Sequence, residues 1–135
     1  MKTIIKTAQA PEPVGPYNQA VRIGNLVFTS GQIPIDPQTN GLVENEILTQ
    51  TEQVMENLGA VLEAAGISFE DVIKTTVFLK NMDDFTKMNE IYQVYFRSNF
   101  PARTTVEVSR LPKDVLVEIE CIAEMPSNKS ANKLS

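Results

Sequence analysis

Residues 101–124, PARTTVEVSRLPKDVLVEIECIAE, decide the fold that the sequence predicts. Two runs rich in β-branched residues, 104–108 and 115–124, are expected as strands, separated by the turn-forming residues 109–114. Along the second run the odd-numbered side chains are apolar, whereas Glu118, Glu120 and Glu124 alternate with them. One face of this strand therefore fits a helix-covered core, and the other face fits a subunit interface or the wall of a pocket.

The rest of the chain supplies two helices and further strands. Apolar residues recur at helical spacing over 46–65, where Gly66 is placed for a left-handed C-terminal cap. A second apolar stripe covers 85–95, and Asp83 is expected to cap that helix. The remaining expected elements are strands at 2–6, 18–23, 26–30 and 72–80, a hairpin turn at Gly24-Asn25, and a loop over 31–41. This order predicts an α+β fold in which one mixed sheet carries two helices on one face.

Length and composition restrict the function. The 135 residues suit a single domain over 1–126 with a polar C-terminal tail at 127–135. The net charge of -5, with no basic run, disfavours nucleic-acid binding. No His and one Cys exclude Ser-His and Cys-His nucleophiles, His-ligated metal sites and an internal disulfide. No stretch is long and apolar enough to span a membrane, and none resembles a signal peptide, so a cytoplasmic protein is expected.

Arg103 and Glu120 are the strongest candidates for chemistry. A symmetric antiparallel hairpin between their strands would place Arg103 opposite Glu120, and Thr105 opposite Glu118. One interpretation is an ordinary cross-strand ion pair. The other is a functional pair, in which the Arg binds a substrate carboxylate through two parallel hydrogen bonds and the Glu holds a water.

The other candidate residues each have a structural and a functional interpretation. Tyr17 follows a Pro-rich loop and either lines a site or closes an edge of the core. Ser30-Gly31 ends a strand, where a Gly either lets backbone amides face a ligand or simply turns the chain. Asn89 lies beside the apolar stripe of its helix and is either solvated or part of the site. Cys121 is expected as a small core residue, because its strand parity points inward.

Three stretches stand out as motifs: residues 15–20 (GPYNQA), residues 28–32 (FTSGQ) and residues 101–120, with an Arg, a Leu-Pro turn and a terminal Glu-Ile-Glu. With them the chain resembles the reactive intermediate deaminase A family, also called the YjgF/YER057c/UK114 family, over residues 2–126. The resemblance implies a chorismate-mutase-like α+β fold assembled as a homotrimer. In such trimers the three sheets line a barrel-like centre, and pockets form in the clefts between subunits.

The resemblance also implies an activity that needs no cofactor. It is the hydrolysis of reactive 2-imino acids, such as 2-iminobutanoate and 2-iminopropanoate, and of their enamine tautomers, to 2-oxo acids and ammonia. The family pattern assigns Arg103 as the carboxylate anchor and Glu120 as the residue that positions the hydrolytic water. It assigns the shaping of the pocket to Tyr17, Ser30, Gly31 and Asn89.

One position departs from part of the family. Some members have a Cys two residues after the Arg, where this chain has Thr105. Cys121 does not replace that thiol, because it belongs to a different expected strand. The departure argues against thiol-based roles and leaves deamination unaffected.

Two other function classes compete with the deaminase. The first is a ligand-sensing regulatory trimer without catalysis; the presence of Arg103 favours the enzyme, because family subgroups that lack the Arg have no such activity. The second is an RNA-cleaving translation inhibitor, which the acidic balance and the missing His disfavour. The expected partners are a small 2-imino or 2-oxo acid and further copies of the same chain, with no nucleic acid and no membrane.

Overall fold

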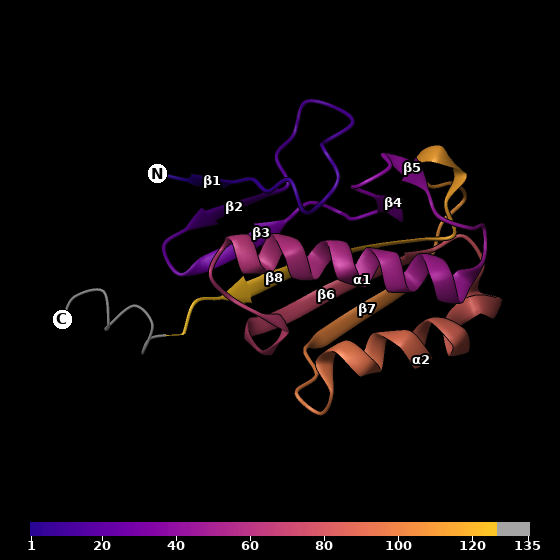
Figure 1. Cartoon of the computed structure of the whole chain (residues 1–135). Helices are drawn as coiled ribbons and strands as arrows, with labels where there is room; N and C mark the ends of the chain where they lie inside the picture. The colour runs from indigo at the N-terminus through magenta and orange to yellow at the C-terminus, as the bar shows by residue number, and fades with distance from the viewer. Residues whose placement is uncertain (127–135) are drawn as a thin grey trace.

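The computed structural model describes residues 1–126 as a six-stranded sheet with two helices on one face (Figure 1). In spatial order the sheet strands are β1 (Thr3–Ile5), β2 (Ala20–Ile23), β3 (Leu26–Thr29), β8 (Val117–Glu124), β6 (Val72–Leu79) and β7 (Ala102–Glu107). The helices are α1 (Ile47–Ala64) and α2 (Phe85–Phe96). The expected α+β architecture is confirmed. The predicted tail, 127–135, lies outside the described residues.

The loop expected over 31–41 contains a small additional pairing. A separate two-stranded sheet joins β4 (Ile35–Asp36) to β5 (Gly41–Leu42). These strands are too short to show alternation in the sequence, which is why the Pro-rich stretch predicted only a loop.

The two helices begin differently from one another. Glu46 caps α1, since its carboxylate accepts the N–H groups of Leu48 at 3.1 Å and Thr49 at 2.9 Å. The expected cap of α2 by Asp83 is wrong. A short 3₁₀ turn, Met82–Asp84, precedes α2, and the Asn81 side chain opens that turn by accepting the Asp83 N–H at 2.9 Å. Asp83 therefore lies inside the 3₁₀ turn, and its side chain does not cap α2.

The sheet confirms one predicted hairpin and corrects another. β2 and β3 pair antiparallel through the turn at Gly24, whose φ of +57° is the left-handed conformation that glycine favours. The predicted hairpin between residues 104–108 and 115–124 is wrong. β7 pairs in parallel with β6, and β8 pairs antiparallel with β6 on its other side. The succession β6, α2, β7 is a βαβ crossover, which places its two strands next to each other and parallel.

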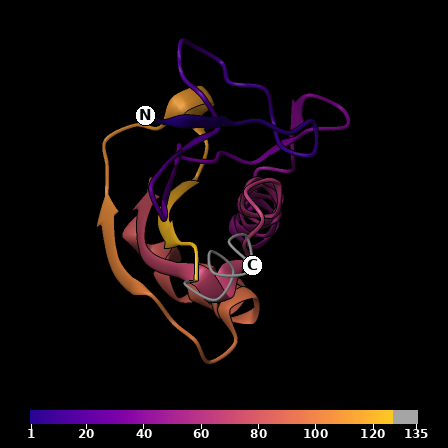
Figure 2. The same cartoon turned by 90° about the vertical axis from the view of Figure 1, so that its left-hand side faces the viewer.

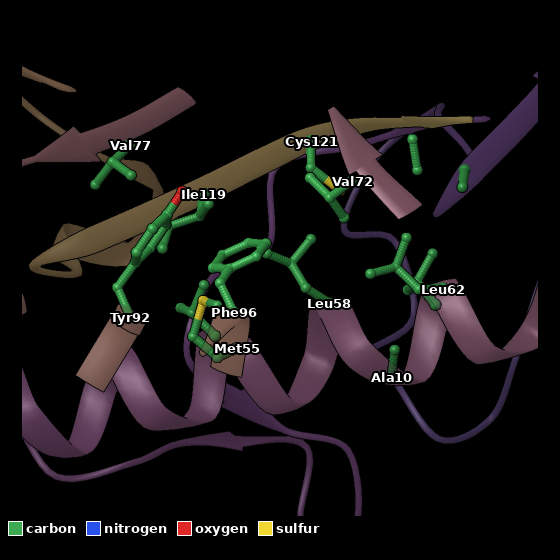
Figure 3. Packing of buried hydrophobic residues seen from close by; sticks show 14 of the residues in the cluster. Ala10, Met55, Leu58, Leu62, Val72, Val77, Tyr92, Phe96, Ile119 and Cys121 are labelled. Atoms are coloured by element: carbon green, nitrogen blue, oxygen red, sulfur yellow. The ribbon is translucent and has the colours of Figure 1, made fainter. Parts of the chain in front are cut away.

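The core fills the space between the sheet and the helices (Figure 3). Alternate residues of β8, including Ile119 and Cys121, are buried there, as the sequence predicts. Leu58 and Phe96 meet them from α1 and α2. Figure 2, a view along the sheet, shows both helices on one side of the strands. The even-numbered residues of β8 lie on the opposite face of the sheet, which neither α1 nor α2 covers.

Candidate active site

Arg103 lies on the edge strand β7, beneath α2. Its in-register neighbour on β6 is the buried Thr75, so its side chain is on the helix-covered face. The guanidinium Nη1 donates to the Asn89 Oδ1 at 2.7 Å. The guanidinium carbon lies 4.8 Å from the ring centroid of Tyr92 and 5.4 Å from that of Phe85. Two aromatic rings and one amide therefore hold the cation in a fixed orientation.

Tyr92 of α2 packs against the guanidinium of Arg103. Its hydroxyl forms a 2.7 Å hydrogen bond with the Thr75 hydroxyl, which fixes the ring in that position. Burial raises the pKa of Tyr92, and the hydrogen bond with Thr75 and the charge of Arg103 oppose that rise. Tyr92 therefore stays neutral, and its ring serves as a packing surface for Arg103 rather than as an acid.

A pocket of about 380 Å³ opens beside the Arg103 side chain. Its lining combines amides, aromatic rings and one cation, and comprises Asn89, Tyr92, Gln93, Phe100, Pro101 and Arg103. Among residues 1–126, no carboxylate lies within ion-pair distance of Arg103. The guanidinium thus borders a pocket and has no acidic partner among the described residues.

Glu120 does not lie opposite Arg103, which corrects the cross-strand pair expected from the sequence. Glu120 faces Thr76 of β6, whereas Arg103 faces the adjacent Thr75. Successive residues of a strand point to opposite faces, so the two functional side chains lie on opposite faces of the sheet. The ion-pair interpretation is therefore wrong within a single chain.

A β-bulge at Ser30-Gly31 lies beside Glu120. Phe28 pairs with Ile122, and the next bridge joins Gln32 to Ile119, so four steps along one strand match three along the other. The Ser30 hydroxyl donates to the Asn18 carbonyl at 2.5 Å. Within residues 1–126 the Gly31 N–H donates to no acceptor, because the bulge takes it out of the ladder. An unpaired backbone donor thus lies next to the Glu120 strand.

Glu118 closes over the same bulge. A Cβ placed on Gly31 would clash with the Glu118 Oε2 and lie 2.8 Å from its carboxyl carbon, so a larger residue at this position requires the Glu118 side chain to move. Burial, and then the charge of Glu120, raise the pKa of Glu118. The Glu118 carboxyl is therefore partly desolvated and close to a second acid.

Tyr17 belongs to a loop that one buried amide holds in place. The Gln19 Nε2 donates to the carbonyls of Ala10 at 3.2 Å and Pro11 at 2.9 Å, and the Gln19 Oε1 accepts the Thr7 N–H at 2.7 Å. Tyr17 is 46% exposed and lines a small cavity together with Gly31. The Pro-rich loop thus extends over the Gly31 bulge.

Comparison with known proteins places this architecture in a family. A family model described as endoribonuclease L-PSP matches residues 7–125. The chain belongs to the endoribonuclease L-PSP family. A RutC family protein of Pyrococcus horikoshii is 61% identical over 123 residues, which are 91% of this chain and 98% of the relative. A 2-iminobutanoate/2-iminopropanoate deaminase of Salmonella typhimurium is 49% identical over 126 residues, which are 91% of this chain and 98% of that protein.

Solved structures of the L-PSP family share the fold. The Escherichia coli YjgF gene product matches with a TM-score of 0.87 at 45% identity, over 92% of this chain and 99% of that one. Escherichia coli TdcF, solved with bound serine, matches with a TM-score of 0.88 at 45% identity, with the same coverage of both chains. The resemblance to the YjgF family, and its α+β fold, are confirmed.

In this L-PSP family chain the six candidate residues separate into two groups. The structure brings Arg103 and Asn89 together under α2, and it places Tyr17, Ser30 and Gly31 around the bulge beside Glu120. The Thr105 hydroxyl, two residues after Arg103, is buried and has no hydrogen-bond partner within residues 1–126.

Sequence reasoning missed the residues that hold these groups in place. Phe85 and Tyr92 were missed, although they lie four residues before and three residues after the candidate Asn89, on the same face of α2. That spacing was the available signal for a cluster around Arg103. Gln19 belongs to the motif at residues 15–20, but its role could not be assigned from the sequence, because it depends on a loop that folds back over it.

No helix of the described part of this L-PSP family protein is long and apolar enough to cross a membrane.

Proposed function

We propose that this chain hydrolyses reactive 2-imino acids and their enamine tautomers to 2-oxo acids and ammonia, as a homotrimer with pockets between subunits. In this proposal Arg103 anchors the substrate carboxylate, and Glu120 positions and deprotonates the water. Tyr17, Ser30, Gly31 and Asn89 shape the pocket. The same proposal places the protein in the cytoplasm, where pyridoxal-phosphate enzymes release such imines.

One observation carries the proposal: the Arg103 guanidinium is oriented but lacks an acidic partner among residues 1–126. The Asn89 side chain accepts a hydrogen bond from one guanidinium nitrogen, while the rings of Tyr92 and Phe85 pack against the guanidinium. The remaining N–H donors keep the planar fork that matches a carboxylate through two hydrogen bonds. A small 2-imino acid carries such a carboxylate next to its C=N bond.

A second copy of the chain is required to complete the site, because Arg103 and Glu120 are on opposite faces of the sheet. The face that carries Glu120 has exposed apolar side chains, including Ile4 at 57% and Phe28 at 37% exposure. Burial of such a face against other copies is favourable, and a closed ring would bring the Glu120 face of one copy to the Arg103 edge of the next.

The chemistry needs few groups because a protonated imine is already electrophilic. The water oxygen bonds to C2 while one water proton passes to the Glu120 carboxylate, and the C=N electron pair moves to nitrogen. Glu120 then returns that proton to the nitrogen of the carbinolamine. The C–N bond breaks with its electron pair on ammonia, the hydroxyl proton leaves, and the 2-oxo acid and ammonium remain.

Binding and rate have separate origins in this scheme. The hold of Arg103 on the carboxylate is present in substrate and transition state alike, so it mainly lowers KM. Fixing the water against C2 lowers the barrier itself, because it supplies proximity and orientation before the reaction begins.

The names of the relatives support this activity more than RNA cleavage. The Salmonella relative is named for imine deamination, and TdcF binds serine, which presents an amino-acid carboxylate. The family description names an endoribonuclease, but this chain has no His and a net charge of -5. It thus lacks the usual acid–base side chain and the basic surface of a ribonuclease.

The test is a coupled assay. A dehydratase generates 2-iminobutanoate in situ, and its decay to the oxo acid is followed with and without the purified protein. Faster decay that is proportional to protein concentration supports the enzyme. Saturable binding of the oxo acid without faster decay would instead support the ligand-sensing trimer.

A further inference from the structure

Thr75 is a polar residue in an otherwise apolar set of core positions on β6. Four residues of this strand are buried: Val72, Thr75, Val77 and Leu79. Of these, only Thr75 carries a polar side-chain atom, and its exposed fraction is 0%. A valine would fill nearly the same space without a hydroxyl that must leave water. Packing therefore does not explain why this position holds a threonine.

The Thr75 hydroxyl is paired with the phenol of Tyr92. The two oxygens lie 2.7 Å apart, and Tyr92 is only 4% exposed. Figure 3 shows the Tyr92 side chain reaching from α2 towards the sheet. Removing one partner of such a pair leaves a buried hydroxyl unsatisfied, but replacing both by apolar groups of the same shape is nearly neutral. Stability alone thus does not account for the pair either.

This hydrogen bond connects α2 to the strand position beside Arg103. Thr75 and Arg103 are in-register neighbours on β6 and β7. The Tyr92 ring centroid lies 4.8 Å from the guanidinium carbon, and the Asn89 Oδ1 on the same helix accepts from Nη1 at 2.7 Å. The hydroxyl pair therefore fixes where both α2 groups lie against the guanidinium.

The other ring contact of Tyr92 is less directional. Its ring lies 4.6 Å from that of Phe96, centroid to centroid, with the planes tilted by 40°. Apolar packing of this kind tolerates small shifts, because it depends mainly on the area removed from water. A hydrogen bond weakens steeply when its distance or angle changes. The link to Thr75 is thus the contact that fixes the position of the ring.

We propose that Thr75 is a positioning residue for Arg103. Its hydroxyl fixes the Tyr92 ring, and the ring fixes the direction in which the guanidinium presents its remaining N–H donors. Thr75 does not line the pocket beside Arg103, so it acts only through Tyr92. It is a candidate that the sequence did not mark, because the contact joins β6 to α2.

The catalytic consequence rests on the deaminase activity proposed above, whereas the positioning does not. A guanidinium that is turned slightly still binds a carboxylate. It then holds the imine carbon away from the water that must attack it, and small displacements of this kind are costly for the reaction. Turnover should therefore fall more than affinity when the hydroxyl of Thr75 is lost.

The positioning is tested by nitrogen NMR of the full-length protein labelled in its arginine side chains. The chain has four arginines, and the Arg103 signal is assigned by its loss in Arg103→Lys. The Arg103 Nε–H signal should move in Thr75→Val and stay in place in Thr75→Ser, which keeps the hydroxyl. Thr51→Val is the matched control, because it removes a buried hydroxyl of α1 that has no hydrogen-bond partner within residues 1–126. It should leave the Arg103 signal in place.

The double variant Thr75→Val/Tyr92→Phe separates positioning from stability. Both hydroxyls are gone, so its melting temperature should return close to that of the wild type. The Arg103 signal should remain displaced, and kcat should fall about tenfold while the affinity for 2-oxobutanoate, measured by titration calorimetry, stays within about threefold. A purely structural pair would instead restore the signal and kcat together with the melting temperature.

An Arg103 signal that stays in place in the double variant overturns the proposal, and so does a wild-type kcat in that variant. If Thr75→Val alone does not fold, the double variant decides. A displaced signal in a protein that proves to have no deaminase activity supports the positioning by Thr75 and refutes the proposed function. Deaminase activity with an unmoved signal supports the proposed function and refutes the positioning.

Discussion

Arg103 and Glu120 lie on opposite faces of one sheet, with β6 between their strands. Arg103 shares the helix-covered face with Thr75, and Glu120 shares the open face with Thr76. The shortest path between them in one chain passes through the sheet itself. A pocket that uses both side chains therefore takes them from two different copies.

This arrangement predicts complementation between two inactive variants. When Arg103→Ala and Glu120→Gln chains are co-expressed, some pockets combine the intact Arg of one chain with the intact Glu of the other. Random assembly into a ring of identical head-to-tail contacts gives about a quarter of the pockets both groups. Deaminase activity should therefore recover to about a quarter of the wild-type value, measured by the coupled assay.

The control for complementation is each variant alone, together with its mass by light scattering. All three preparations should have about three times the chain mass of 15.0 kDa. If mixed oligomers of that mass show no recovery of deaminase activity, the site does not combine residues from different copies. A monodisperse monomer would refute the shared pocket altogether.

Substitution of Arg103 should remove activity and preserve the fold. Arg103→Ala is expected to show no measurable deamination, because each charge-assisted hydrogen bond to the carboxylate contributes about 1.5–3 kcal/mol and the imine carbon also loses its position. Arg103→Lys should be severely impaired, since an ammonium cannot reproduce the planar fork. Thermal melting on the same samples is the control. An active Arg103→Ala protein refutes the anchor role.

Glu120→Gln should keep binding and lose turnover. The amide keeps the shape of the side chain but cannot accept the proton of water, so kcat is expected to fall on the order of 10²-fold. Titration calorimetry with 2-oxobutanoate should give an affinity close to that of the wild type, because Arg103 remains. Unchanged turnover would mean that Glu120 has only a structural role.

The sequence predicted the elements better than it predicted their pairing. The alternation over Val117–Glu124 identified the buried and open faces of β8, because side-chain parity is a local property. The position of β8 between β3 and β6 is not local. It follows from the crossover through α2, which places β7 beside β6 and leaves the other edge of β6 for β8.

For the candidate site, too, the sequence identified residues but not their spatial arrangement. Arg103 and Glu120 were found as residues by their types and their motif, but the assumed hairpin placed them together on one face. Whether a side chain faces its partner depends on strand neighbours that are distant in sequence. The supporting roles of Tyr92 and Gln19 were not predicted for the same reason. Their hydrogen bonds join segments that only the tertiary fold brings together.

Cys121 is predicted to be inert in the native protein. Burial raises the pKa of its thiol to about 12, and the Thr29 hydroxyl lies 3.8 Å from the sulfur. Because the pKa is raised, the thiol stays protonated at pH 8 and carries almost no nucleophilic thiolate. A thiol reagent at that pH should therefore label the folded protein very slowly and label it rapidly in denaturant. Fast labelling of the folded protein would contradict the burial of Cys121.

The final prediction concerns the contact between Gly31 and Glu118. Gly31→Ala places a methyl group where the Glu118 Oε2 lies, so the Glu118 side chain must move. We expect a loss of about 1 kcal/mol in the free energy of unfolding, measured by denaturant titration. In a Glu118→Ala background the space is empty, and the same substitution should cost almost nothing.

The coupling between the two substitutions, and not the single loss, identifies the contact. A coupling energy of about 0.5 kcal/mol or more is expected, which is the range for residues that touch. Gly41→Ala is the matched control, because the nearest atom to its added Cβ lies 3.6 Å away, on Thr39, an ordinary contact. Strict additivity of Gly31→Ala and Glu118→Ala would show that Glu118 does not occupy the space over Gly31.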